Sequence, residues 1–216
     1  MKNSLFFLTI VLVFSGCKKP EPKQEKAEKS KEKIEVQNPL TRLEKDFKFS
    51  HLTAFEIDTF NWETRPGNYV ELDSQTFRLV WQDPKRKFIG QGNDRDYLYS
   101  WQTKTPDRIE FVILSQDESS YCDLLQYCIF DKNGKAIDNF IVASSCGDGG
   151  WSYESSGKLI AENKFEIKGT ESESELIGLE SNETIEGDST ITHLTIGENG
   201  KVMKEEISKV HFRKKL

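Results

Sequence analysis

The chain has 216 residues, and its 30 Lys and Arg against 36 Asp and Glu give a formal net charge of −6 at pH 7. Beyond residue 37 the balance is more acidic, with 22 basic and 31 acidic groups and a net charge of −9. Such a surface repels phosphate backbones, so the composition argues against nucleic-acid binding.

Residues 1–16 have the layout of an export signal. Lys2 supplies a positive start, Leu5 to Phe14 is an apolar run broken only by Thr9, and small residues precede Cys17. As a helix this run would reach only ~15 Å, about half of a ~30 Å hydrocarbon core, which argues against a transmembrane anchor. An ordinary secretory signal cut near Gly16 and a buried core helix are the alternatives.

The stretch Ser15-Gly16-Cys17 resembles the lipobox of bacterial lipoproteins, with Phe14 standing where Leu is usual. The resemblance implies diacylglyceryl attachment to Cys17, cleavage before it and acylation of the new α-amino group. Two or three acyl chains make membrane anchoring stable. Lys18 follows the cysteine, where aspartate would resemble an inner-membrane retention signal. We therefore expect the outer membrane, with the leaflet left open.

Residues 17–37 are expected to form a lipidated cysteine followed by a disordered tether. The segment 18–37 is dense in Lys, Glu and Pro and nearly free of apolar side chains, so it cannot bury enough surface to offset its ordering entropy. A helix over its Glu-Lys part is the alternative. Residues 38–216 are long enough for a single domain with its own core.

The domain is predicted to be mainly β after one short N-terminal helix. Asn38-Pro39 is typical of a helix start, with Asn as N-cap and Pro at the first helical position. Further segments are rich in aromatic and branched side chains and alternate with turn-forming groups, as strands do. They are Phe55 to Ile57, Phe60 to Trp62, Thr76 to Trp81, Tyr97 to Trp101, Arg108 to Leu114, Tyr121 to Phe130 and Ala136 to Ser144. The expected fold is an antiparallel meander that closes into a barrel or a curved sheet.

The clearest hairpin surrounds Asp131-Lys132-Asn133-Gly134-Lys135. A type I turn with Gly134 in a left-handed conformation would set Asp131 opposite Lys135. That register places Cys122 opposite Ser144 and three apolar pairs across the strands. The pairs are Ile129 with Ile137, Leu125 with Ile141 and Leu124 with Val142.

Three cysteines remain once Cys17 is assigned to lipid. In this register Cys146 lies diagonal to Cys122 on one face, whereas Cys128 lies about 20 Å along the strand from Cys122. We therefore predict a Cys122–Cys146 disulfide and a buried free thiol at Cys128.

Two more hairpins are expected, at Ser155-Ser156-Gly157-Lys158 and at Glu198-Asn199-Gly200-Lys201. The second would pair Ile196 with Val202 and Ile191 with Ile207. The segment 170–190 holds seven acidic residues and no basic one. It is expected to form a loop or a charged edge strand.

The stretch Cys146-Gly147-Asp148-Gly149-Gly150-Trp151 is the most suggestive of a site. Its glycines could surround an anion with backbone N–H groups, or Cys146 could be a nucleophile. However, a strand is expected on both sides, without the strand, glycine loop and helix of a phosphate cradle. A tight loop that carries a disulfide cysteine is the favoured interpretation.

No catalytic residues, metal site or cofactor are predicted. The histidines His51, His193 and His211 show neither metal-ligand spacing nor a catalytic signature. Asp131 to Gly134 lacks the acidic series of a calcium loop. The four tryptophans could line a cleft for sugars or apolar ligands, although core packing is the default for aromatic residues on strands. They are Trp62, Trp81, Trp101 and Trp151.

The leading functional hypothesis is a non-enzymatic binding or interaction module of the cell envelope, held to the membrane by lipid on Cys17. Its partner would be a small ligand or an envelope protein. The Ser-Gly-Cys-Lys-Lys start, the Lys/Glu tether and the Asn-Gly-Lys turns are similar to those of envelope lipoproteins of Bacteroidota, which implies no activity. The alternative is an envelope hydrolase with its site near Cys146 to Gly150.

Overall fold

A computed structural model describes residues 38–57, 68–89, 94–175 and 184–215. The chain divides into two units, Met1–Glu35 and Val36–Leu216, and all described residues belong to the second. Its helical elements are two 3-10 helices, η1 (Pro39–Asp46) and η2 (Glu118–Ser120), and the α-helix α1 (Ser74–Val80). The predicted signal, Cys17, the tether, Phe60 and Trp62 lie outside the described residues.

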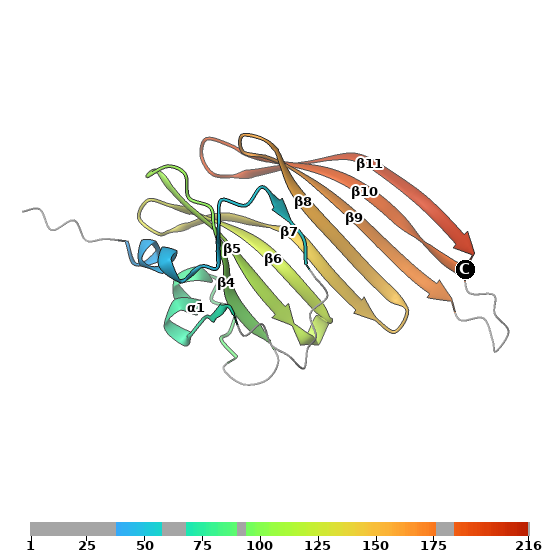
Figure 1. The fold of residues 1–216 in the computed structure, drawn as a ribbon, viewed down its shortest axis with the longest axis horizontal. Coiled ribbons are helices and arrows are strands. Elements are labelled where there is room, and N and C mark those ends of the chain that lie inside the picture. The colour runs from blue at the N-terminus through green and yellow to red at the C-terminus, as the bar shows by residue number, and fades with distance from the viewer. Residues whose placement is uncertain (1–37, 58–67, 90–93, 176–183, 216) are drawn as a thin grey trace, which may run out of the picture. The chain divides into compact units, whose positions relative to one another are not determined.

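Strands dominate the described chain, in one 11-stranded sheet. From β4 to β11 each strand pairs antiparallel with the next, and Figure 1 shows this order across the sheet. The short strands β1 and β3 pair with β4, and β2 pairs with β8. The strands are β1 (Phe49–Ser50), β2 (Ala54–Phe55), β3 (Val70–Glu71), β4 (Arg95–Trp101), β5 (Arg108–Asp117), β6 (Cys122–Asp131), β7 (Ala136–Asp148), β8 (Trp151–Ala161), β9 (Lys164–Glu175), β10 (Thr184–Ile196) and β11 (Val202–Lys215). The sheet is not closed, so the predicted meander is confirmed as a curved sheet.

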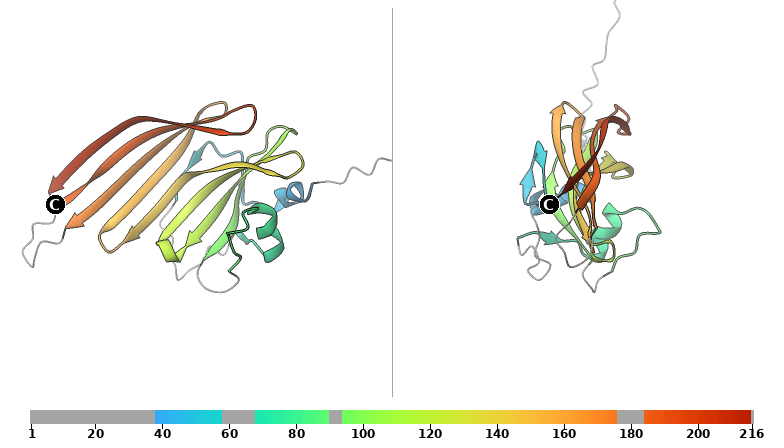
Figure 2. Two further views of the ribbon diagram at one scale, coloured as in Figure 1. Left: turned by 180° about the vertical axis from the view of Figure 1, so that it is seen from behind. Right: turned by 90° about the vertical axis from the view of Figure 1, so that its right-hand side faces the viewer.

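One hydrophobic core lies between the helices η1 and α1 and one face of β4, β5 and β6. Phe111 is fully buried there, and its ring stacks on Trp101 and Phe130. Leu40 of η1 and Phe77 of α1 cover these rings. Figure 2 shows both helices beside the β4 end of the sheet and neither over β9 to β11.

A second core fills the other side of β4 to β6. Val112, Leu125 and Tyr127 face Phe55 of β2, and Phe165 of β9 packs edge-on against Tyr127. The strands β7 and β8 pair only from Ser144 to Asp148 and from Trp151 to Ser155. Beyond those pairs β8 pairs with β2 instead.

The N-terminal helix is confirmed, but the strand predicted at Thr76 to Trp81 is wrong. Asn38 accepts a hydrogen bond from the Leu40 amide at 3.0 Å, as an N-cap does. In place of the predicted strand the chain forms α1, which Asp73 caps by accepting a hydrogen bond from the Thr76 amide at 2.7 Å. Phe77 and Val80 then share the buried side of one helical turn. This cap outweighs the aromatic and branched residues that suggested a strand.

The hairpin turn after β6 forms as predicted, but the register does not hold along the strands. Gly134 has φ +84°, and the Asp131 amide donates to the Lys135 carbonyl at 2.9 Å. Bulges shift the pairing between Ile129 and Phe130 and again between Leu125 and Gln126, which corrects all three apolar pairs and the partner of Cys122. The observed pairs are Ile129 with Asp138, Leu125 with Ala143, Leu124 with Ser144 and Cys122 with Cys146.

Two further expectations are corrected. Ser155 to Lys158 is not a turn, because β8 runs through it and the chain turns at Asn163, whose φ is +58°. The described parts of 170–190 lie in β9 and β10, and each of these strands is paired on both sides.

The last hairpin forms with Ile196 opposite Val202. A bulge in β11 places Ser208 opposite Ile191, so the predicted Ile191–Ile207 pair is wrong.

Candidate functional site

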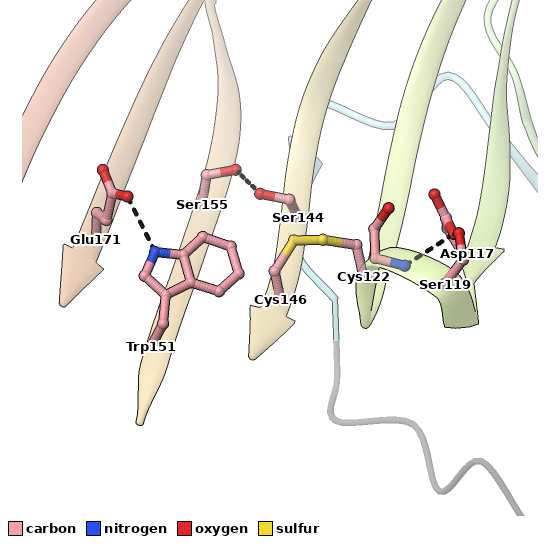
Figure 3. The surroundings of a disulfide bond; sticks show 9 residues. Asp117, Ser119, Cys122, Ser144, Cys146, Trp151, Ser155 and Glu171 are labelled. Atoms are coloured by element: carbon pink, nitrogen blue, oxygen red, sulfur yellow. Dashed lines mark hydrogen bonds between the residues drawn. A yellow bond between two sulfur atoms is a disulfide. The ribbon is translucent and has the colours of Figure 1, made fainter. Parts of the chain in front are cut away.

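The structure joins Cys122 of β6 and Cys146 of β7 by a disulfide, the pair for which the sequence analysis predicted one. The two residues are direct partners across the strands, with Cα atoms 4.1 Å apart. Figure 3 shows the bond beside Trp151 and the hydrogen-bonded pair Ser144 and Ser155. Cys146 therefore presents no thiol that could act as a nucleophile.

The glycine loop after Cys146 forms the connection between β7 and β8. Gly149 and Gly150 have φ +57° and +117°, which favours glycine at both positions. The Gly150 carbonyl accepts from the Ser174 amide at 2.8 Å, and Trp151 Nε1 donates to Glu171 at 3.0 Å. These contacts fix the loop against β9, so its geometry is explained by a strand connection.

The histidines lie apart from one another. His51 is exposed with φ +50°, His193 lies 3.6 Å from Glu166, and His211 lies 3.1 Å from Asp188. Within the described ranges, no group of three or more His, Cys, Asp and Glu side chains could hold a metal ion. Cys128 is a buried free thiol, and burial raises its pKa.

A cavity lies elsewhere, on the face of β4 to β6 that α1 partly covers. It has a volume of about 420 Å³, within the size range of small-molecule sites. The loop 85–89 and β3 form its rim. Its apolar lining consists of Leu72, Phe77, Phe88, Ile89 and Leu124.

A fixed polar network forms one wall of this cavity. Asp96 of β4 accepts from Trp81 Nε1 at 2.8 Å, from Arg86 Nη2 at 3.1 Å and from the Ser115 hydroxyl of β5. The Arg86 guanidinium also lies 3.6 Å above the Trp81 ring, a cation–π contact. Arg86 is thus held by a carboxylate and an aromatic face at once.

Burial raises the pKa of Asp96, whereas the nearby Arg86 charge and the hydrogen bonds from Ser115 and Trp81 oppose that rise. The Asp96 side chain is only 9% exposed, while that of Arg86 is 33% exposed. The Asp96 carboxylate is therefore more deeply buried than the Arg86 guanidinium, and both residues line the cavity.

The remaining acids around the cavity already have internal partners. Glu71 forms an ion pair with Arg95 at 3.1 Å, and Asp117 accepts from the Ser119 hydroxyl at 2.7 Å. By contrast, Lys85 and Lys87 form no ion pair within the described part of the chain. Lys85 and Lys87 therefore add two cations to a lining that also carries the acids Asp94 and Asp117.

This cavity did not follow from the sequence. Trp81 was expected in a strand, and neither Arg86 nor Asp96 was among the candidate residues. The available signal was the run Lys85-Arg86-Lys87-Phe88-Ile89, in which three cations directly precede two large apolar residues. Of the three described tryptophans, Trp101 and Trp81 belong to the core and Trp151 contacts Glu171, while Trp81 also donates to Asp96 at the wall of the cavity.

No protein-family model, curated protein or solved structure matches this chain. In the described residues, no helix is both long and apolar enough to cross a membrane.

Proposed function

We propose that the chain is a lipid-anchored, non-enzymatic binding module of the cell envelope whose cavity beside Arg86 takes a small anionic amphiphile. The observation that carries the proposal is a guanidinium held at the wall of a 420 Å³ cavity that also has an apolar lining. A ligand with one anionic group and one apolar part matches both features.

Arg86 would bind the anionic group of the ligand. Its described hydrogen bonds use Nη2, so Nη1 and Nε keep their donors for a carboxylate or a phosphate. Stacking on Trp81 restricts the guanidinium before any ligand arrives, which lowers the entropic cost of binding. Lys85 and Lys87 add charge of the same sign at the rim.

The apolar part of the ligand would contact Phe77 and Phe88, whose ring centroids are 5.4 Å apart. Phe88 and Ile89 are 38% and 51% exposed, so apolar surface reaches from the cavity to its mouth. Covering this surface gives a favourable term of about 25 cal/mol per Å². The cavity therefore supports binding through two separable contributions.

A calorimetric titration with three ligands of one chain length tests the charge preference. Decanoate, decanol and decylamine share a ten-carbon chain and differ in the charge of the head group. We expect decanoate to bind at least tenfold more tightly than decanol, and decylamine to bind least. Equal affinity for the three, or no binding of decanoate, would refute the anionic preference.

Variants locate the binding site. Arg86→Gln should weaken decanoate binding about tenfold or more, because hydrogen bonds to charged groups contribute ~1.5–3 kcal/mol. Arg213→Gln is the matched control, since Arg213 lies on β11, away from the cavity. Lys87→Gln should weaken binding less and tests the charge without disturbing Asp96.

The anchor is a separate part of the proposal and rests on Ser15-Gly16-Cys17. Cys17→Ser should move the protein from the membrane fraction to the aqueous fraction and remove the mass of the acyl chains from the N-terminal peptide. Outer-membrane placement is tested by density separation of the two membranes. A Cys17→Ser variant that stays in the membrane fraction would disprove the lipid anchor.

A further inference from the structure

The sheet has two edges, and they differ in how they are covered. At one edge β4 pairs with β1 and β3, and η1 packs nearby. At the other edge β11 pairs with β10 alone, over Val202–Lys215, and no other described strand pairs with its outer side. A row of outward N–H and C=O groups along a 14-residue strand is a template for another strand.

Large apolar side chains gather on this edge strand. Met203, Ile207 and Val210 are 61%, 46% and 59% exposed, and they account for three of the nine exposed large hydrophobic residues in the described chain. Met203, Val210 and Phe212 pair with Thr195, Ser189 and Gly187 of β10. The three partners are separated by even numbers of residues along β10 and therefore lie on one face of it, so the three apolar side chains opposite them share that face of the sheet.

The charges of β11 are divided along its length. Glu205 and Glu206 lie in its first half beside the single cation Lys204, whereas Lys209, Arg213, Lys214 and Lys215 lie in its second half. An antiparallel neighbour of the same sequence would bring the acidic half of one strand beside the basic half of the other. A parallel neighbour in register would instead place the basic halves together.

We propose that β11 pairs antiparallel with β11 of a second copy of this chain, about a two-fold axis at the bulge beside Ile207. In this register Glu206 lies opposite Lys209 of the second copy, and Met203 lies opposite Phe212. Glu205 lies opposite Val210. Because the pairing is two-fold, every contact occurs twice, and the sheet continues from one copy into the other.

Cysteine cross-linking at the axis tests the register. The protein is the purified full chain with Cys17→Ser, so that residue 17 contributes no thiol; Cys122 and Cys146 are bonded to each other and Cys128 is buried. Ser208→Cys should give a disulfide-linked dimer under mild oxidation. Ser189→Cys is the matched control, because β10 lies one strand further from the axis and cross-strand disulfides need Cα atoms within about 7 Å. Equal cross-linking of both variants, or of neither, would overturn the proposal.

Charge changes at Val210 test the interface without a cross-link. The chain mass is 24.9 kDa, so light scattering after size exclusion separates monomer from dimer. Val210→Glu should raise the dimer dissociation constant at least tenfold, because it faces Glu205 of the second copy. Val210→Lys should leave the dimer intact, and Glu205→Lys combined with Val210→Glu should restore it. A monomeric parent chain, or a dimer that Val210→Glu leaves unchanged, would refute the pairing.

Discussion

The strands β5 and β11 belong to one sheet but have opposite surroundings. In β5 every residue from Ile109 to Gln116 is buried, whereas β11 has no buried residue. The helices η1 and α1 cover one side of β5, and β2, β9 and β10 supply side chains to the core on its other side. The sequence of β5 is accordingly apolar on both faces near its centre, whereas half of the residues of β11 are charged. The pattern of a strand thus reports what covers it.

This contrast implies that stability is unevenly distributed. The covered region consists of β4 to β7 with the two helices, and here large side chains are fully buried. The parts of β8 to β11 that lie beyond the two cores are held in place mainly by backbone pairing between the strands. Free energy lost on mutation should therefore depend strongly on the region that is changed.

The largest effect is expected for Phe111→Ala in the covered region. Its ring is fully buried and stacks on Trp101 and Phe130, so truncation leaves a cavity that the helices cannot fill. We expect a loss of about 3–5 kcal/mol in the free energy of unfolding, measured by urea denaturation. Val210→Ala on β11 should cost less than about 0.5 kcal/mol. Similar losses for both variants would contradict the contrast between the regions.

The disulfide is expected to have the next largest effect. It joins β6 to β7 next to the point where the chain passes into β8, and it closes a segment with a sequence separation of 24. The double change Cys122→Ser with Cys146→Ser should lower the free energy of unfolding by about 2–4 kcal/mol. Reducing the unmodified protein should give the same loss, and the reductant should have no further effect on the variant. A loss below about 0.5 kcal/mol would show that native contacts alone hold this junction.

Much of the fold follows from the sequence because local turn chemistry and alternation specify it. Asn38-Pro39, the Asp131 to Lys135 turn and the Glu198 to Lys201 turn all form where they were expected. The positions of the β-bulges could not be predicted from the alternation of residues along one strand, because they depend on packing across the sheet. Two bulges, one between Ile129 and Phe130 and one between Leu125 and Gln126, together moved the partner of Cys122 by two residues, from Ser144 to Cys146.

The candidate site was harder to foresee than the fold. Trp81, Arg86, Asp96 and Ser115 come from four separate segments, and only the tertiary structure brings them together. Gly157 was also misassigned, since its Ser-Gly-Lys context suggested a turn. It lies instead within β8, at a position that favours glycine because a Cβ there would lie 2.3 Å from the Val142 carbonyl oxygen.

Gly157→Ala therefore tests the close approach of β7 and β8 beside the second core. A methyl group there would also lie 2.7 Å from a Val142 methyl carbon, so the backbone must shift. We expect a loss of about 1–3 kcal/mol in urea denaturation. Gly147→Ala is the control, because its nearest neighbour would lie 3.6 Å away and the change should have little effect. Equal losses would mean that the two strands can separate without cost.

The smallest effect should appear in the pH dependence of stability. Asp123 of β6 is buried, and its Oδ1 has no hydrogen-bond partner among the described residues. Burial raises the pKa of Asp123 to about 6 from 3.8, although a hydrogen bond from Gln116 opposes the rise. The folded state therefore disfavours the ionised form. The destabilisation should be absent below pH 4, grow between pH 4 and pH 6, and stay constant above that range.

Asp123→Asn removes this titration while keeping the shape of the side chain. The variant should exceed the parent in stability at pH 8 by on the order of 1–2 kcal/mol, and the difference should disappear near pH 4. Asp188 of β10 provides the opposite case, because hydrogen bonds from Lys209 and His211 lower its pKa. Asp188→Asn should therefore be less stable than the parent above about pH 4, and this deficit should disappear as the pH falls below that value. If both variants changed in the same direction, the contrast between a buried acid of the covered region and an exposed acid of the outer strands would fail.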